Sequence, residues 1–243
     1  MTTGVAIVVA LLAIVQSVFG VGLLVFGTPS LLLMGLPFTH AIGILLPASL
    51  AVSLLQMRHG PRQDSRFGRQ FALWCLAPLV LTMTFVLLTG SRIALNAMIA
   101  SILAAFAILR SSASLRGKVS SFVKKRTSTF LVVVGVVHGA SNLGGGLVTV
   151  LAASMHDKKE DVRGVVAFCY AQLAVIQLLV LGWLSPEVFG WHQLGAAAIS
   201  SSAFILLGRA VFALISARTF DHLLTGLLAS FSALLFAMSA GLF

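Results

Sequence analysis

Long apolar stretches separated by short polar loops run along the whole chain. A transmembrane helix needs about 20 consecutive apolar residues. Stretches of that length cover residues 4–26, 38–57, 71–89, 92–110, 128–151, 164–184, 192–215 and 221–242. This pattern predicts an all-α fold, a polytopic membrane bundle of about seven or eight transmembrane helices.

Two of these stretches are interrupted in the middle by clustered glycines and small polar residues. The first interruption runs from Gln16 to Gly22, and the second runs from His138 to Gly146. A shift of 122 positions places Gln16 on His138. Unpaired backbone amides in hydrocarbon are costly, so such breaks are tolerated only where protein buries them or where they line a cavity. The paired breaks predict two internal repeats whose broken helices form a binding site.

The boundary between the repeats is a serine-rich, basic segment. We therefore expect three parts, which are a first repeat at 1–116, a basic cytoplasmic linker at 117–127 and a second repeat at 128–243. Four spans in each half would give parallel repeats. If the broken segments re-enter instead of crossing, each half keeps three spans and the repeats are inverted. The sequence leaves both arrangements open.

The charges predict which loops share a side of the membrane. Loops 58–69 and 110–126 carry most of the basic residues and are separated by two spans, so both are expected in the cytoplasm. Loop 154–163 balances its basic residues with acidic ones, which suits the opposite face.

The composition also indicates a membrane protein, and it argues against several other classes of protein. The chain is 59% hydrophobic and 9% charged, with a mean hydropathy of +1.07. The basic residues behind the net charge of +10 cluster between the apolar stretches and are not spread over a folded surface, which argues against nucleic-acid binding. Cys75 and Cys169 lie in apolar spans without CxxC spacing, so no disulfide, metal or other cofactor is expected. GxxxxGK[ST] does not occur, so transport would be driven by gradients or by a separate partner.

The chemistry of the breaks favours a small anion. No span interior contains Asp or Glu, which argues against a cation site. A broken helix exposes N-terminal amides with partial positive charge, and glycines let an anion approach them. The expected backbone contacts are Gly20, Gly22, Asn142, Gly144, Gly145 and Gly146. The alternative is that glycines only permit close helix packing, as in Gly135-x-x-x-Gly139.

Polar side chains near the breaks supply further candidates. The expected side-chain contacts are Gln16, Ser17, His138, Ser141, Thr149 and Tyr170. A protonated His138 could bind an anion or couple transport to protons, and a neutral, hydrogen-bonded imidazole is the alternative. Ser53 and Gln56 belong to a polar stripe that recurs around Tyr170 and Gln177. Such a stripe faces the bundle interior, where it contacts substrate or bonds neighbouring helices.

These glycine segments resemble those of the TauE/SafE sulfite exporter family. The resemblance lies in a broken first span that ends in Gly27-Thr28-Pro29 and in its later counterpart, Asn142-Leu143-Gly144-Gly145-Gly146. It implies movement of sulfite and small organosulfonates across the bacterial inner membrane. One departure is that Leu23 and Leu24 occupy the positions that correspond to Gly145 and Gly146, so the second half is expected to dominate the site.

We therefore predict an inner-membrane secondary transporter that exports sulfite, sulfoacetate or related organosulfonates by alternating access. A channel-like facilitator of small anions or neutral solutes is the alternative. An intramembrane enzyme is disfavoured, because its only nearby nucleophile–base pair would be Ser141 and His138, and the following glycines break the helix. The expected partners are a small sulfur anion and the lipid bilayer, with a homodimer left open.

Overall fold

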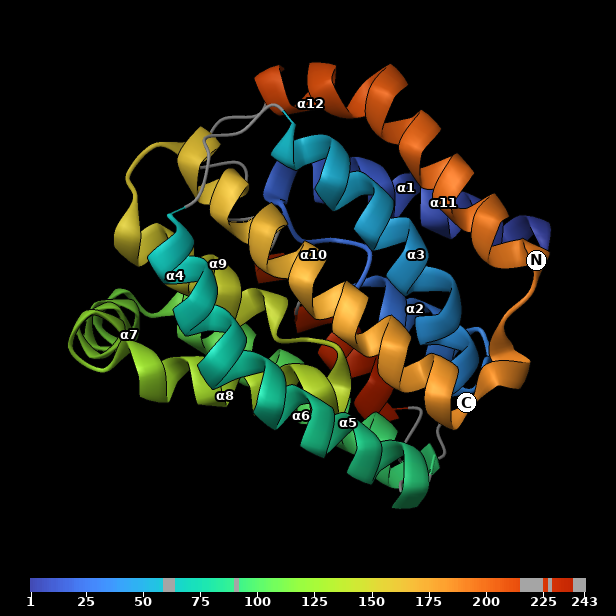
Figure 1. Cartoon of the computed structure of the whole chain (residues 1–243), viewed down its shortest axis with the longest axis horizontal. Helices are drawn as coiled ribbons and strands as arrows, with labels where there is room; N and C mark the ends of the chain where they lie inside the picture. Colours follow the sequence, from blue (N-terminus) through green and yellow to red (C-terminus); the bar gives the residue numbers. More distant parts are fainter. Residues whose placement is uncertain (59–63, 90–91, 215–224, 227–228, 238–243) are drawn as a thin grey trace.

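The computed structural model describes residues 1–58, 64–89, 92–214, 225–226 and 229–237 (Figure 1). Within this part of the chain, the regular elements are all helical. The α-helices are α1 (Thr3–Phe19), α2 (Gly27–Leu33), α3 (Phe38–Met57), α4 (Ser65–Phe71), α5 (Ala77–Thr89), α6 (Arg92–Ser111), α7 (Ala113–Lys125), α8 (Thr127–Ser141), α9 (Gly145–Met155), α10 (Lys159–Leu184), α11 (Trp191–Ala203) and α12 (Arg209–Leu214). Two π-helical turns, η1 (Ala72–Leu76) and η3 (Phe204–Gly208), and the 3₁₀ turn η2 (Pro186–Val188) accompany them, and residues 229–237 are also helical.

Four continuous helical segments are long and apolar enough to cross a membrane. They are α3, residues 65–89, α10 and residues 191–214. A fifth is formed if α6 and α7, which meet at 102°, are counted as one broken span. The all-helical membrane class is thus confirmed, whereas a count of seven or eight spans stays a prediction. Stretches 4–26 and 128–151 are divided into shorter helices, and much of 221–242 lies outside the described residues.

Helix boundaries follow ordinary capping chemistry. Gly35 adopts a positive φ of 87° after α2, and Pro37 then precedes α3 in extended conformation. Ser112 caps α7 by accepting a hydrogen bond of 3.3 Å from the amide of Leu115. Glu160 and Asp161 lie in the first turn of α10, where negative charge is favourable.

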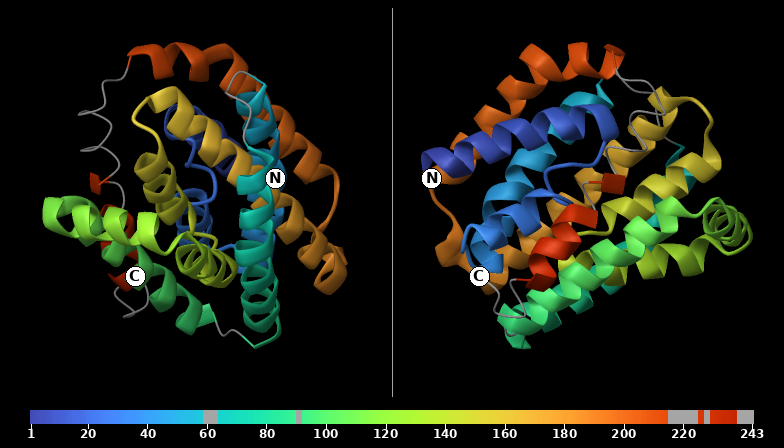
Figure 2. Two further views of the ribbon diagram at one scale, coloured as in Figure 1. Left: turned by 60° about the vertical axis from the view of Figure 1, so that its left-hand side comes forward. Right: turned by 180° about the vertical axis from the view of Figure 1, so that it is seen from behind.

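The first broken stretch folds into a helical hairpin. A Cβ atom on Gly27, at the start of α2, would lie 3.4 Å from Cδ1 of Leu12 in α1. A Cβ atom on Gly4 would lie 3.2 Å from the terminal methyl of Met34, which follows α2. The chain therefore runs along α1, turns, and returns along it through α2. Figure 2 shows this return in its right-hand view, where α1 and α2 are blue.

The second broken stretch is also a hairpin. Helix α9 packs against both α8 and α7, and α7 ends where α8 begins. Helix α9 therefore returns toward the start of α8 (Figure 1). We call α1–α2 the first hairpin and α8–α9 the second hairpin.

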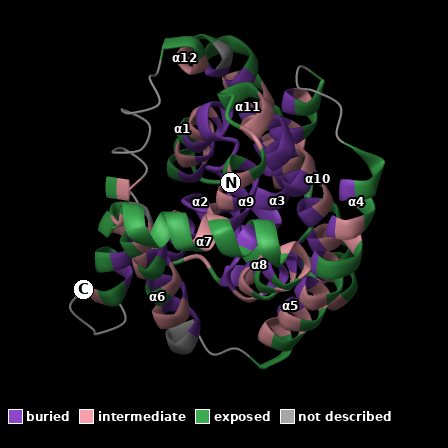
Figure 3. Cartoon of the chain, turned by 90° about the vertical axis from the view of Figure 1, so that its left-hand side faces the viewer, coloured by how far each residue is buried: buried purple, intermediate pink, exposed green. Residues whose placement is uncertain are grey.

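Helices α3 and α10 form the antiparallel centre of the bundle. Gly43, early in α3, lies beside Leu181, near the end of α10, with 3.8 Å between a Cβ built on Gly43 and the Leu181 Cδ2. At the other end, Gln56 of α3 and Arg163 of α10 both donate to the carbonyl of Ser17. Figure 3 shows that buried residues concentrate on the two hairpins and this pair, while α4, α5 and α7 present more exposed faces.

Each hairpin packs mainly against helices from the other half of the chain. Helix α1 packs on α11 and η3, and helix α8 packs on α5 and η1. A Cβ atom on Gly139 of α8 would lie 3.0 Å from Cα of Leu79, and one on Gly135 would lie 3.1 Å from the carbonyl carbon of Cys75. Gly135 and Gly139 thus permit close helix packing, as the packing explanation of this pair predicts.

The hairpins change the expected sidedness of one loop. Because Gln56 and Arg163 reach the same carbonyl, the end of α3 and the start of α10 lie at one end of the bundle. The described start of α10 therefore lies at the same end of the bundle as the end of α3, which disagrees with the expectation that loops 58–69 and 154–163 lie on opposite faces. A second hairpin that returns to its starting side would account for this, because the balanced charges of loop 154–163 would then not follow a membrane crossing.

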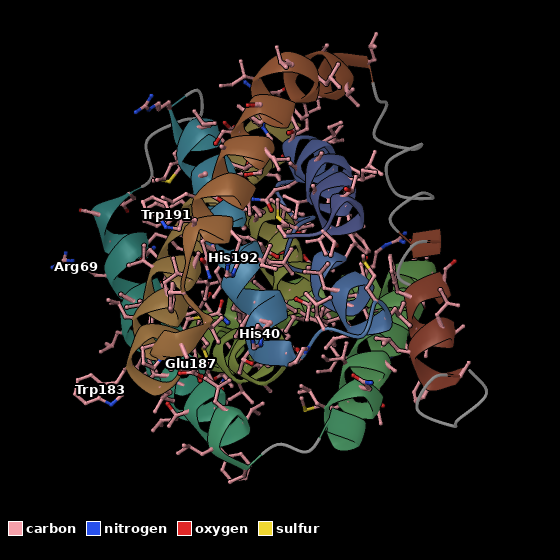
Figure 4. All side chains as sticks on the ribbon, turned by 90° about the vertical axis from the view of Figure 1, so that its right-hand side faces the viewer. His40, Arg69, Trp183, Glu187, Trp191 and His192 are labelled. Carbon is pink, nitrogen blue, oxygen red and sulfur yellow. The ribbon has the colours of Figure 1, made fainter. Side chains whose placement is uncertain are left out.

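The outward faces are apolar, as lipid contact requires. Exposed large hydrophobic side chains line α5 and the segment from α11 to η3. They include Leu81, Phe85, Leu88, Leu194, Ile205 and Leu206. At the end of the bundle remote from Arg163, Trp183 and Trp191 are 86% and 87% exposed, which suits an aromatic belt at a membrane interface (Figure 4).

Candidate functional site

Both breaks turn through a residue in the left-handed region. Gly20 ends α1 with φ of 73°, and Asn142 ends α8 with φ of 65°. Their amides donate to the carbonyls of Gln16 and His138 at 2.8 and 2.7 Å. Glycine adopts this conformation without cost, and asparagine tolerates it better than most residues do. The two turns are thus built alike, 122 positions apart.

The residue two positions beyond each turn must be a glycine. A Cβ atom on Gly22 would lie 2.8 Å from Cα of Gln16, and one on Gly144 would lie 2.6 Å from Cβ of His138. The returning chain therefore touches the helix that it has just left. Hydrogen bonds from Phe26 to the Gly22 carbonyl and from Val148 to the Gly144 carbonyl, at 2.9 and 3.0 Å, then start the return.

In the first hairpin the side chain of Gln16 is fully engaged by the protein. Its Nε2 donates to the Ser49 carbonyl at 3.1 Å and to Oγ of Ser53 at 3.2 Å. Its Oε1 accepts from the amide of Leu23 and from Oγ of Ser49, both at 3.2 Å. Part of the polar stripe on α3 thus bonds a neighbouring helix, and Gln16 closes the first break.

The equivalent side chain in the second hairpin is only partly engaged. Nε2 of His138 lies 3.0 Å from Oε1 of Gln177 in α10. The ring of His138 meets the ring of Tyr170 edge-on, with centroids 6.0 Å apart. Among the described residues, four buried atoms here have no hydrogen-bond partner: Nδ1 of His138, Oδ1 of Asn142, Oη of Tyr170 and Nε2 of Gln177. We call His138, Asn142, Tyr170 and Gln177 the polar cluster.

The polar cluster lies against the first turn of α9. The Tyr170 hydroxyl occupies the space into which a Cβ of Gly145 would project. Nδ1 of His138 lies 3.0 Å from the position of a Cβ on Gly144. The first amides of a helix have no intrahelical acceptor and carry partial positive charge. The second hairpin therefore combines glycine backbone, helix N-terminus and unpaired polar atoms in one place.

The corresponding part of the first hairpin is filled by hydrocarbon. Leu23 and Leu24 are fully buried, and the Leu23 amide is held by Gln16. Helix α2 is also short, with 7 residues. The two breaks thus share their turn but differ in available donors.

The hairpins meet through a bond between their tips. The Nδ2 of Asn142 donates to Oγ1 of Thr28, the second residue of α2, at 2.9 Å. In the sequence, Thr28 stands out only as part of the Gly27-Thr28-Pro29 motif, and it is not among the predicted site residues. No local pattern points to a contact across 114 positions.

The three remaining hydroxyl candidates bond to the backbone of their own helices. Ser17 donates to Ala13, Ser141 to Val137 and Thr149 to Gly145, at 2.7, 2.7 and 2.9 Å. Gly146 faces Phe106 of α6, with a built Cβ 2.8 Å from its ring. Of the predicted site residues, the structure brings five together: His138, Asn142, Gly144, Gly145 and Tyr170. Three more lie beside them in the second hairpin: Ser141, Gly146 and Thr149. The other four lie in the first hairpin: Gln16, Ser17, Gly20 and Gly22.

A cationic group lies close to the first turn. Arg163 donates through Nη1 to the carbonyl of Ser17 at 3.3 Å, and its guanidinium lies 3.7 Å from the ring centroid of Phe212. Lys159 approaches the same ring at 4.6 Å. From the sequence, Arg163 is expected only as one of the charges of loop 154–163. Its contact with the C-terminal turn of α1 is favourable for a cation.

The apolar outer faces and the buried, uncharged breaks define a multi-pass helical membrane protein. The sequence matches the family described as "Sulfite exporter TauE/SafE" over residues 5–235. The chain therefore belongs to the TauE/SafE sulfite exporter family, as the glycine segments predict. Proteins of this family are transporters rather than enzymes. No curated protein and no solved structure matches the chain.

Proposed function

We propose that this protein is a secondary transporter that exports small sulfur-containing anions, such as sulfite or sulfoacetate, across the bacterial inner membrane. Family membership supports a membrane sulfite exporter. The observation that carries the choice of site is the polar cluster at the first turn of α9, where Tyr170 and Gln177 bear unpaired polar atoms. Hydroxyl and amide donors next to a helix N-terminus suit an oxyanion.

The charge of the surroundings supports an anion over a cation. Among the described residues, the buried polar side chains include no Asp, Glu, Lys or Arg. A buried cation without a carboxylate would lack the ligands that hard cations prefer. Partial charges from the α9 N-terminus favour the opposite sign.

Burial favours a carrier over a channel. His138, Asn142 and Tyr170 each have 0% exposure, so this conformation gives the cluster no open path to water. A carrier must pass through such a closed state, whereas an open channel keeps its constriction in contact with solvent. Alternating access would then follow from movement of the hairpins against the α3–α10 pair.

The proposed architecture is a pair of inverted repeats, at residues 1–116 and 128–243. Its support is the pair of matching turns at Gly20 and Asn142 and the antiparallel course of α3 and α10. Re-entrant hairpins leave an odd number of crossings in each half, which gives inverted repeats. The basic linker proposed at 117–127 falls within α7 and the start of α8.

Counterflow in proteoliposomes tests the transporter proposal. Purified protein is reconstituted with unlabelled sulfite or sulfoacetate inside, and labelled substrate is added outside. Saturable uptake that depends on internal substrate supports a carrier. Flux that rises linearly with concentration and needs no internal substrate would instead support a channel-like facilitator. A lack of flux and of binding for every sulfur anion would refute the proposal.

A further inference from the structure

The pairing of His138 with Gln177 leaves both a donor and an acceptor without a protein partner. If Nε2–H of His138 donates to Oε1 of Gln177, then Nδ1 is left as an acceptor and the Gln177 amide as a donor. If the Gln177 amide is turned and donates to Nε2, then Nδ1–H is left as a donor and Oε1 as an acceptor. Either arrangement of a neutral imidazole presents one of each.

The other two members of the polar cluster, Asn142 and Tyr170, also offer one unpaired acceptor and one unpaired donor. Asn142 donates to Thr28 through Nδ2, which leaves its carbonyl oxygen unpaired. The hydroxyl of Tyr170 is unpaired and can donate. A ligand that offers only acceptor oxygens would therefore satisfy Tyr170 and one member of the His138–Gln177 pair, and it would leave buried acceptors without partners. Unsatisfied buried polar groups are costly.

We infer that the transported sulfur compound carries its own hydrogen-bond donor in addition to its anionic oxygens and has a net charge of −1 or zero. This inference rests on the proposed function and narrows its substrate class. Three compounds meet this requirement. The donor is a hydroxyl group in O-protonated hydrogen sulfite and in isethionate, and it is an ammonium group in taurine. Sulfate is disfavoured, and so is sulfoacetate among the candidates of the proposed function, because both are dianions without a donor at neutral pH.

The absence of formal charge from the site supports the limit on ligand charge. The buried polar side chains that the structure describes include no Lys or Arg. The desolvation cost of an ion rises with the square of its charge, and here only neutral donors and a helix N-terminus compensate it. A dianion would need a cationic partner, which the cluster does not supply while His138 is a neutral imidazole.

A matched pair of ligands tests the inference on the unmodified protein. Isethionate and ethanesulfonate differ by one hydroxyl group and have the same charge and chain length. We expect isethionate to bind about tenfold more tightly, measured by calorimetry on the purified protein in nanodiscs. Equal affinities would overturn this inference and leave the proposed function intact. Failure of both ligands, and of sulfite, to bind would refute the proposed function itself.

A variant locates the preference in the polar cluster. Gln177→Met keeps the length of the side chain and removes its amide. We expect the isethionate-to-ethanesulfonate affinity ratio to fall toward one, because isethionate loses its partner while ethanesulfonate loses less. A ratio that stays near ten in a folded Gln177→Met protein would contradict the assignment to this pair. The wild-type comparison stands by itself if the variant does not fold.

Discussion

The side-chain amide of Asn142 donates a hydrogen bond of 2.9 Å to the hydroxyl oxygen of Thr28. Asn142 forms the left-handed turn of the second hairpin, and Thr28 lies in the first turn of α2 in the first hairpin. Both side chains have 0% exposure. This bond therefore joins the tips of the two hairpins in the closed conformation, next to the proposed anion site.

Thr28→Val should destabilise the closed protein. Valine matches threonine in shape and removes the acceptor, so the buried amide of Asn142 loses its partner. We expect the free energy of unfolding to fall by about 1–3 kcal/mol. Thermal unfolding of the purified protein in detergent measures the effect. Thr28→Ser keeps the hydroxyl and serves as the matched control.

Asn142→Gly distinguishes the role of the left-handed backbone turn from the role of the Asn142 side chain. Glycine adopts the left-handed conformation at least as well as asparagine, so the hairpin should form. The side-chain amide that bonds Thr28 and belongs to the polar cluster is absent from this variant. We expect correct membrane insertion with weakened substrate binding. Unchanged affinity would show that Asn142 serves only the backbone turn.

Gln16→Met should act on stability and not on substrate affinity. The side chain bonds Ser49, Ser53 and Leu23, and its replacement leaves all three without that partner. A loss of about 2–4 kcal/mol is expected, since several buried groups become unsatisfied together. Binding measured on the folded fraction should match wild type. A large change in Kd at unchanged unfolding temperature would return Gln16 to the substrate contacts.

Tyr170→Phe should lower substrate affinity and leave stability unchanged, which is the reverse of the result expected for Gln16→Met. Its hydroxyl is buried and has no partner among the described residues, so removing it costs the fold nothing. The unfolding temperature should hold or rise, while affinity for the anion falls about fivefold through loss of one hydrogen bond. Calorimetry and thermal unfolding on the same sample provide the comparison. A drop in stability with unchanged affinity would contradict a role in binding.

The two breaks could be located from the sequence, but the hydrogen-bond partners of Gln16 and His138 could not. Glycines in apolar stretches are a local signal, and Gln16 and His138 do occupy equivalent positions. Their different roles depend on neighbours from other helices. Ser49 and Ser53 engage Gln16 fully, whereas Gln177 engages one nitrogen of His138. Such tertiary contacts leave no trace in the periodicity of a single helix.

The direction in which the chain continues after each break could not be predicted from the sequence either. Re-entrance requires Gly22 to lie against Gln16 and Gly27 to lie against Leu45. The contact of Gly27 with Leu45 forms only once α3 is in place beside α1. The hydrophobicity of 4–26 is the same for a crossing and for a hairpin, so the sequence left parallel and inverted repeats open.

Gly145→Ala should disrupt the site while leaving the protein inserted. The new Cβ would overlap the hydroxyl of Tyr170 and lie 2.5 Å from its Cζ, so ring or helix must shift. We expect loss of detectable anion binding. Gly117→Ala is the matched control, because nothing lies within 4 Å of its Cβ. There alanine should stabilise exposed helix α7 by about 0.5–1 kcal/mol.

Cysteine labelling can test whether the second hairpin re-enters. Asp157 follows α9, Ser121 lies on α7 and Glu187 lies beyond α10, and all three are exposed. A returning hairpin leaves Asp157 on the side of the basic helix α7, which the positive-inside rule places in the cytoplasm. Glu187 should then lie on the other side, beside Trp183 and Trp191 (Figure 4).

The expected pattern distinguishes the two topologies directly. A membrane-impermeant maleimide should label Glu187→Cys in intact spheroplasts, and it should label Ser121→Cys and Asp157→Cys only in inside-out vesicles. The native Cys75 and Cys169 are buried, so the unmodified protein gives the background. Labelling of Asp157→Cys from outside would mean that α8 and α9 cross the membrane together. The repeats would then be parallel, and the equivalent turns at Gly20 and Asn142 would face the same way.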